Sequence, residues 1–144
     1  MAYTVSKAEV WVAEIRNRPG TLARTLEAMT NAGAQLEFMI ARKLNDDTSR
    51  VFLAPIKSPK QKKAARDAGL SPVSNLHSIR IEGPDRPGLG AEITRAIAAE
   101  GVNLRGASGA AIGRKAVFHI AVETEQAMKD ALRAARKFLN AKKR

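Results

Sequence analysis

The chain has 144 residues, of which 44% are hydrophobic, 27% charged and only 4% aromatic, which is typical of one ordinary globular domain or two small ones. No stretch approaches the roughly 18 consecutive apolar residues of a membrane span, and the first residues lack a basic flank before an apolar core, so we expect neither membrane insertion nor secretion but a cytoplasmic protein. The absence of cysteine excludes disulfides and cysteine-ligated metals, and no nucleophile or carboxylate lies at a recognisable spacing from His77 or His119. We therefore expect no metal site, no cofactor and no enzymatic activity.

The formal net charge of +11 is concentrated in two segments of the chain. Residues 57–66 contain five basic side chains and no acidic one, and residues 129–144 contain seven basic side chains and one acidic one. In the rest of the chain the numbers of acidic and basic residues are equal. Such runs are typical of the solvated face of a helix, and they also fit an anionic partner.

The chain contains an internal repeat. The segment Asn17-Arg18-Pro19-Gly20 matches Asp85-Arg86-Pro87-Gly88 at an offset of 68 residues. The same offset pairs Glu14 with Glu82, Ala23 with Ala91, Ala28 with Ala96, Gly33 with Gly101 and Leu36 with Leu104. Further on, Val51-Phe52 matches Val117-Phe118 at an offset of 66, which predicts that the copies differ by two residues in the intervening hairpin.

The first copy predicts alternating strands and helices. A strand over 10–15 reaches the Pro-Gly turn, and a helix follows with apolar residues at helical spacing, ending at Gly33. A hairpin then joins strands over 35–43 and 50–56. A second helix begins at Ser58-Pro59, a good cap and first-turn pair, and ends at Gly69.

The second copy repeats this order. It predicts a strand over 79–82, a helix from Leu89 to Gly101, strands over 103–110 and 115–123, and a longer helix from Thr124 to about Leu139. The remaining Asn-Ala-Lys-Lys-Arg is too short and too charged for a buried strand. We therefore expect that the second copy lacks its last strand, or that residues 3–5 or another segment completes the sheet.

Strand–helix–strand–strand–helix–strand is the α+β, ferredoxin-like βαββαβ plan, with two helices on one face of an antiparallel sheet. The sequence predicts two tandem copies, over 1–74 and 75–144. Each copy is small enough to be marginally stable alone, so we expect the copies to pack together and the chain to form a homodimer.

The repeated motif carries candidate chemistry. In each copy a strand ends in Asn or Asp, followed by Arg-Pro-Gly and then a helix. Glycine permits a positive φ, and the helix presents unpaired amides with partial positive charge that can hold a carboxylate. Asn17 or Asp85 can accept a hydrogen bond from an ammonium, so the loop suits the head of a free amino acid. The alternative is that Arg-Pro-Gly only makes a tight turn.

The segments Asn17-Arg18-Pro19-Gly20-Thr21-Leu22-Ala23 and Asp85-Arg86-Pro87-Gly88-Leu89-Gly90-Ala91 resemble the ACT domain, and the resemblance covers nearly the whole chain as a tandem pair. It implies a regulatory module that binds a small ligand, usually an amino acid, at an interface between ACT units, and that acts on a regulated enzyme or regulator protein. The implied ligand-binding residues are Asn17, Arg18, Pro19, Gly20, Thr21 and Leu22, and in the second copy Asp85, Arg86, Pro87, Gly88, Leu89 and Gly90.

The two loops are not expected to be equivalent. Only Asp85 carries a charge that attracts an ammonium, and Gly90 stands where the first copy has Leu22, which would leave room for a ligand. We therefore expect a ligand to prefer the second loop.

The alternative function is a basic ferredoxin-like protein that binds nucleic acid or an acidic protein partner through its second helices. Sequence-specific RNA modules of this fold stack bases on exposed aromatic side chains, whereas Phe52 and Phe118 are predicted to face the core. Binding of nucleic acid is therefore not expected beyond salt-sensitive contacts to phosphates.

Overall fold

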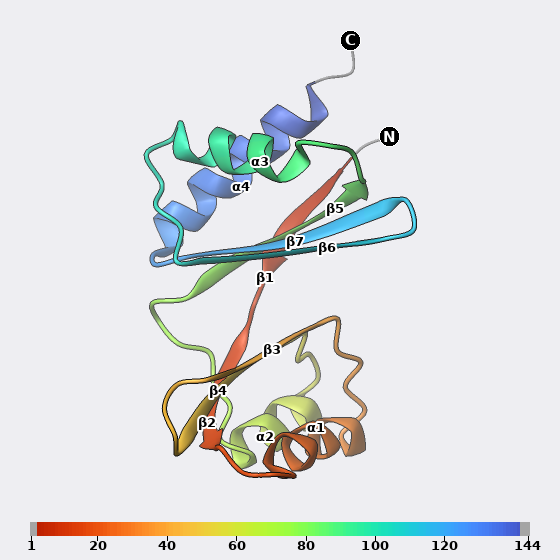
Figure 1. Ribbon diagram of the computed structural model, residues 1–144, viewed down its shortest axis with the longest axis vertical. Helices are drawn as coiled ribbons and strands as arrows, with labels where there is room; N and C mark the ends of the chain where they lie inside the picture. Colours follow the sequence, from red (N-terminus) through yellow and green to blue (C-terminus); the bar gives the residue numbers. More distant parts are fainter. Residues whose placement is uncertain (1–2, 142–144) are drawn as a thin grey trace. The chain divides into compact units, whose positions relative to one another are not determined.

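The computed structural model describes residues 3–141, which fold into two compact units. One unit spans Glu9–Val73, and the other comprises the residues from Ser74 onward together with the N-terminal strand β1 (Thr4–Ala8). Both are α+β units with a single antiparallel sheet (Figure 1). Over the described residues no helix combines the length and the apolar composition needed to cross a membrane.

The first unit contains β2 (Trp11–Arg16), α1 (Thr21–Asn31), β3 (Phe38–Lys43), β4 (Thr48–Ala54) and α2 (Pro59–Asp67). Its strands are ordered β2-β4-β3, and both helices lie on one face of the sheet (Figure 1). At the open edge of β2, Val12 and Ser71 exchange two backbone hydrogen bonds of 2.9 and 3.0 Å. The predicted element order is therefore confirmed, with this short bridge at the position of the fourth strand.

The core of the first unit lies between its sheet and its helices. Trp11, Val51 and Leu53 point into it from the strands, and each is at most 1% exposed. Phe52 alternates with these residues and is half-buried on the opposite face, opposite Val12 on β2. The prediction that Phe52 faces the core is wrong, because side chains alternate along a strand and its two neighbours occupy the core face.

The second unit contains β5 (His77–Pro84), α3 (Leu89–Ala98), β6 (Gly106–Ile112), β7 (Lys115–Val122) and α4 (Glu125–Asn140). Its strands are ordered β1-β5-β7-β6, and α3 and α4 cover one face of the sheet (Figure 1). Buried aliphatic side chains of both layers form the core, among them Ile79, Ile81, Ile93, Ile97 and Ile120. Phe118 packs against this cluster, as predicted.

Strand β1 supplies the fourth strand that the second copy lacks. It pairs antiparallel with β5 from Thr4 opposite Glu82 to Ala8 opposite Ser78, and Val5 is buried with only 5% of its surface exposed. The expectation that the segment around residues 3–5 completes this sheet is confirmed. The range 1–74 expected for the first copy therefore differs from the observed unit in its first eight residues, because the apolar edge of β5 takes up β1.

The pairing of the strands shows that the two copies differ in length by one residue, not by the predicted two. Ala13 lies opposite Val51 in the first unit, and Ile81 lies opposite Phe118 in the second. Ala13 and Ile81 are 68 residues apart, whereas Val51 and Phe118 are 67 apart, so the second hairpin is one residue shorter. The prediction of two residues is wrong, because the Val-Phe match aligned residues that face opposite sides of their sheets.

Candidate functional site

Both repeated motifs form the same strand-to-helix turn. Gly20 has φ 87° and Gly88 has φ 83°, in the left-handed region that favours glycine, and each caps its helix without a hydrogen bond from a side chain. The following amides, of Thr21 and Leu89, each make a long 3.3 Å bond to the carbonyl of the motif arginine. The first turns of α1 and α3 therefore lack a side-chain cap in either copy.

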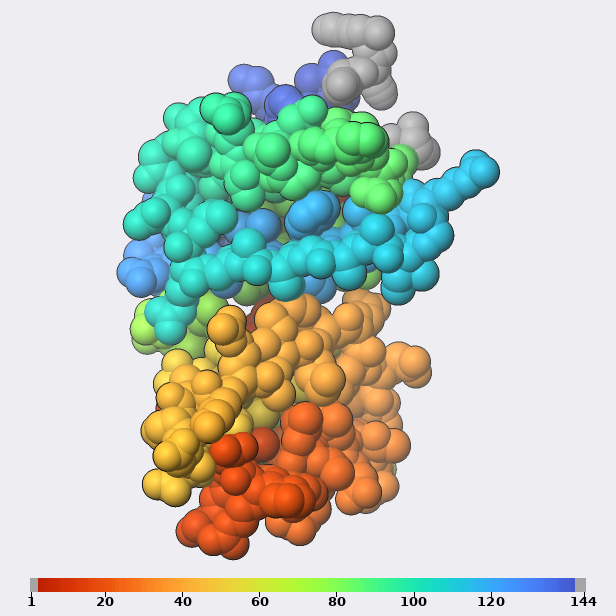
Figure 2. Space-filling view, viewed as in Figure 1, coloured from red at the N-terminus to blue at the C-terminus, as the bar shows by residue number. Residues whose placement is uncertain are grey.

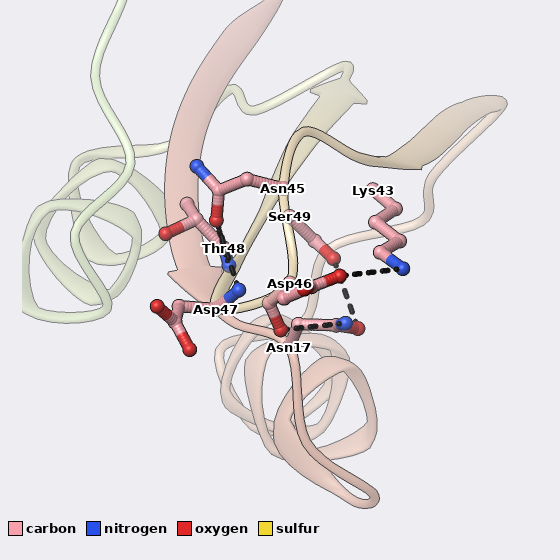
Figure 3. Close-up of polar contacts among 7 residues, drawn as sticks. All are labelled: Asn17, Lys43, Asn45, Asp46, Asp47, Thr48 and Ser49. Atoms are coloured by element: carbon pink, nitrogen blue, oxygen red, sulfur yellow. Dashed lines mark hydrogen bonds and ion pairs between the residues drawn. The ribbon is translucent and has the colours of Figure 1, made fainter.

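The side chain of Asn17 is engaged within the first unit. Its Nδ2 donates to the carbonyl of Asp46 at 3.2 Å, and its Oδ1 accepts from Ser49 Oγ at 3.4 Å (Figure 3). In the same turn Asn45 Oδ1 accepts the amides of Asp47 and Thr48, both at 2.9 Å. Asn17 thus ties the motif loop to the β3–β4 turn, which is a structural role.

Asp85 occupies the same position in the second unit, and its surroundings differ. Its amide donates to the carbonyl of Arg114 at 2.8 Å, the equivalent of the bond from the Asn17 amide to Asp47. Its side chain is exposed, and within residues 3–141 its carboxylate has no hydrogen-bond or ion-pair partner. Asp85 is therefore an accessible anion at the end of β5.

The second loop also contains a short ion pair. Arg86 Nη2 lies 2.7 Å from Glu92 Oε1, and this contact is the main cause that raises the pKa of Arg86. Glu92 Oε2 is 3.8 Å from where a Cβ on Gly88 would lie, so the carboxylate is close to the start of α3. The first copy has Arg24 at this position, and α1 has no acidic residue in its first turn. Glu92 thus partly neutralises the positive N-terminal end of α3, whereas the N-terminal end of α1 keeps its partial positive charge.

Tyr3 joins the second loop from strand β1. Its hydroxyl donates to the carbonyl of Pro84 at 2.7 Å, and after Glu92 it helps to raise the pKa of Arg86. Its ring lies over Gly83, where a Cβ would collide with Tyr3 Cδ2 and would lie 2.7 Å from Cε2. Sequence reasoning missed both Tyr3 and Glu92. Gly83, an unusual residue within a strand, was the one signal that something approaches β5 closely.

The expectation of free space beside Gly90 is wrong. A Cβ there would lie 3.4 Å from Phe118 Cε2, and a Cβ on Gly109 would lie 2.7 Å from the same atom. The two glycines therefore accommodate the ring of Phe118. A pocket of about 350 Å³ lies at the other end of α3, lined by Gly101, Asn103 and Thr124 among others, and no residue of the motif contributes to it.

Two ferredoxin-like α+β units, each with a glycine-capped strand-to-helix turn, thus define a tandem module in which the second loop presents an accessible acid. The family model of the ACT domain matches residues 77–140, which include α3, α4 and the second motif. The matched residues lie within the second unit, which is therefore similar to the ACT domain over most of its length.

Solved structures share this fold over most of their length. Protein BT0572 from Bacteroides thetaiotaomicron has a TM-score of 0.73 at 19% identity, over 88% of this chain and 87% of that one. Regulatory subunits of aspartate kinase are also similar: that of Thermus thermophilus has a TM-score of 0.66 at 16% identity, over 95% and 96% of the two chains, and that of Thermus flavus 0.58 at 17% identity, over 95% and 96%. At these identities the similarity establishes the fold. No curated protein sequence matches the chain.

Proposed function

We propose that the chain is a non-enzymatic, cytoplasmic regulatory module that binds a free amino acid at its second motif loop. The observation that carries this proposal is the carboxylate of Asp85, which has no side-chain partner among residues 3–141 and stands beside a helix N-terminus without a side-chain cap, in the unit that matches the ACT family model. A free amino acid carries an ammonium and a carboxylate a few ångströms apart, and the loop offers a group for each.

In the proposed complex the ligand ammonium donates to Asp85, and its carboxylate accepts from the amides at the start of α3, near Gly88 and Leu89. Arg86 is the cation beside these amides, and it now contacts Glu92. The ligand carboxylate would compete with Glu92 for Arg86 and for the end of the helix. Charge-assisted hydrogen bonds of this kind are about twice as strong as neutral ones.

Strand β6 supplies the proposed interface between ACT units. It is the edge of the sheet, it is almost fully exposed, and its sequence Gly-Ala-Ser-Gly-Ala-Ala-Ile places small side chains along the edge. Figure 2 shows the β6–β7 hairpin along the visible surface, with its tip projecting, and Ile112 at this tip is 82% exposed. Pairing with β6 of a second copy would satisfy these backbone groups and form a homodimer.

The proposed partner is an enzyme or regulator protein that responds to the bound amino acid. Support comes from the two Thermus structures, which are regulatory subunits of aspartate kinase and share the fold over nearly the whole chain.

Thermal-shift measurements against the twenty amino acids would identify the ligand, since a ligand that binds only the folded state raises the melting temperature. Isothermal titration of that amino acid would then compare Asp85→Asn, Gly88→Val and Asn17→Ala. A hydrogen bond to a charged group contributes about 1.5–3 kcal/mol, so Asp85→Asn should weaken binding by about 10- to 150-fold.

Gly88→Val should also weaken binding, because valine is strained at φ 83°. Asn17→Ala is the matched control, and affinity should stay within about twofold because that side chain serves the hairpin. We expect one ligand per chain. Equal losses at Asn17 and Asp85 would show two working loops, and unchanged affinity in every variant would leave both motifs as turns only.

A further inference from the structure

An apolar groove runs between α3 and α4 in the second unit. Its volume is about 550 Å³, and it is lined by Ala96, Glu100, Ala134, Lys137, Phe138 and Ala141. None of these residues belongs to the motif loop, so the groove is separate from the proposed amino-acid site. It is an open surface rather than a part of the core.

The groove exists because of the side chains that meet there. Helix α4 buries Met128, Ala135 and Leu139 in the core. Phe138 precedes Leu139 by one residue, a rotation of about 100° around the helix axis, and it stays 36% exposed. Three alanines beside it are too short to fill the space between the helices. An aromatic ring beside an alanine-lined hollow is a surface into which an aliphatic side chain can pack.

The uncompensated charge at the groove is positive. Lys137, which lines the groove from α4, has no side-chain hydrogen-bond or ion-pair partner in the part of the chain that the structure describes. The acid of the groove, Glu100, lies 3.5 Å from Arg133 and is therefore compensated.

We propose that this groove docks an acidic amphipathic helix of a partner protein. Aliphatic side chains of that helix pack on Ala96, Ala134 and Phe138, while its flanking carboxylates face Lys137. A second copy of this chain is disfavoured as the occupant, because the same groove of that copy would bring another uncompensated Lys137 to the contact. Nucleic acid is disfavoured as the occupant, because its phosphates make no favourable contact with the apolar side chains that line the groove.

The test uses the full-length protein and a labelled synthetic peptide of about 18 residues, with leucine on one helical face and glutamate along both flanks. Fluorescence anisotropy at about 50 mM NaCl should show binding, and binding should weaken steeply as salt is raised. Two control peptides, one with glutamine in place of leucine and one with lysine in place of glutamate, should bind at least about tenfold more weakly, since each lacks one half of the recognition.

Two protein variants locate the contact. Lys137→Glu should weaken binding of the acidic peptide about tenfold or more, and Ala96→Arg should block the groove from a half-exposed helix position. Lys60→Glu on α2 is the matched control, because it makes the same charge change on another exposed basic helix, and it should change affinity less than about twofold.

Three results would overturn the proposal: equal losses for Lys60→Glu and Lys137→Glu, equal binding of the glutamine peptide, or no binding of the acidic peptide. A single-stranded oligonucleotide that binds more tightly and loses affinity with Lys137→Glu would assign the surface to nucleic acid instead. Self-association that Ala96→Arg abolishes in sedimentation would assign it to a second copy. The outcome is independent of amino-acid binding at Asp85, which these variants leave intact.

Discussion

The incorporation of strand β1 into the second unit makes a direct prediction for Val5→Ala. Val5 lies opposite Ile81 and contributes to the core of the second unit. The change removes two methyl groups, worth about 0.8 kcal/mol each, and the cavity raises the total loss of stability to roughly 1.6–3 kcal/mol. For a chain of this length the melting temperature should fall by roughly 4–10 °C.

Hydrogen exchange read by mass spectrometry can show which unit is weakened. Val5→Ala should speed exchange in peptides from β5 and β7, whereas peptides from β2 and β4 should keep their protection. Trp11, the only tryptophan, lies in the first unit and gives a second readout, because its fluorescence should be native-like while β5 exchanges faster.

Thr4→Ala is the control on the same strand. Thr4 is exposed, so its replacement should change the free energy of unfolding by no more than about 0.5 kcal/mol. The reasoning fails if Val5→Ala speeds exchange in β2 and β4 while β5 keeps its protection, since β1 would then belong energetically to the first unit.

The remaining predictions concern glycines and an ion pair. Gly90→Ala should stabilise the protein by roughly 0.5–1 kcal/mol in chemical denaturation, because its Cβ makes ordinary contact with Phe118 inside a helix, whereas Gly109→Ala should destabilise it because its Cβ would collide with the same ring. Arg80, followed by Lys115, lowers the pKa of Glu82 below its ordinary 4.5, so this group adds stability above pH 4.5 and loses it as the pH falls through the lowered value. Glu82→Gln should therefore lower the melting temperature slightly at pH 7, by an amount equivalent to about 1 kcal/mol or less, and the difference from the unmodified protein should vanish at low pH.

Sequence reasoning predicted the features that depend on neighbouring residues. Ser58 and Thr124 cap α2 and α4 as expected, by accepting the amides of Gln61 and Ala127. The repeated Pro-Gly turn placed α1 and α3 correctly, because proline, glycine and helix periodicity act over only a few residues.

The errors arose where distant segments meet. Phe52 was assigned to the wrong face because a shift of one residue in a strand reverses every side chain, and the coincidental Val-Phe match supplied that shift. The room beside Gly90 is taken by Phe118, nearly 30 residues further along the chain. Tyr3 reaches Pro84 across 81 residues, a contact that no local pattern encodes.

The two motif loops share a backbone and differ in what their side chains leave available. In the first loop Asn17 is held by Asp46 and Ser49, so an ammonium would have to displace hydrogen bonds that stabilise the hairpin. In the second loop Asp85 has no such contacts within the described chain, and Glu92, the acid with which a ligand would compete, pairs with Arg86 at 2.7 Å. Displacing Glu92 costs less because Arg86 would keep a carboxylate partner in the ligand. This asymmetry favours one amino-acid site per chain, and a symmetric pair of chains would then carry two equivalent sites.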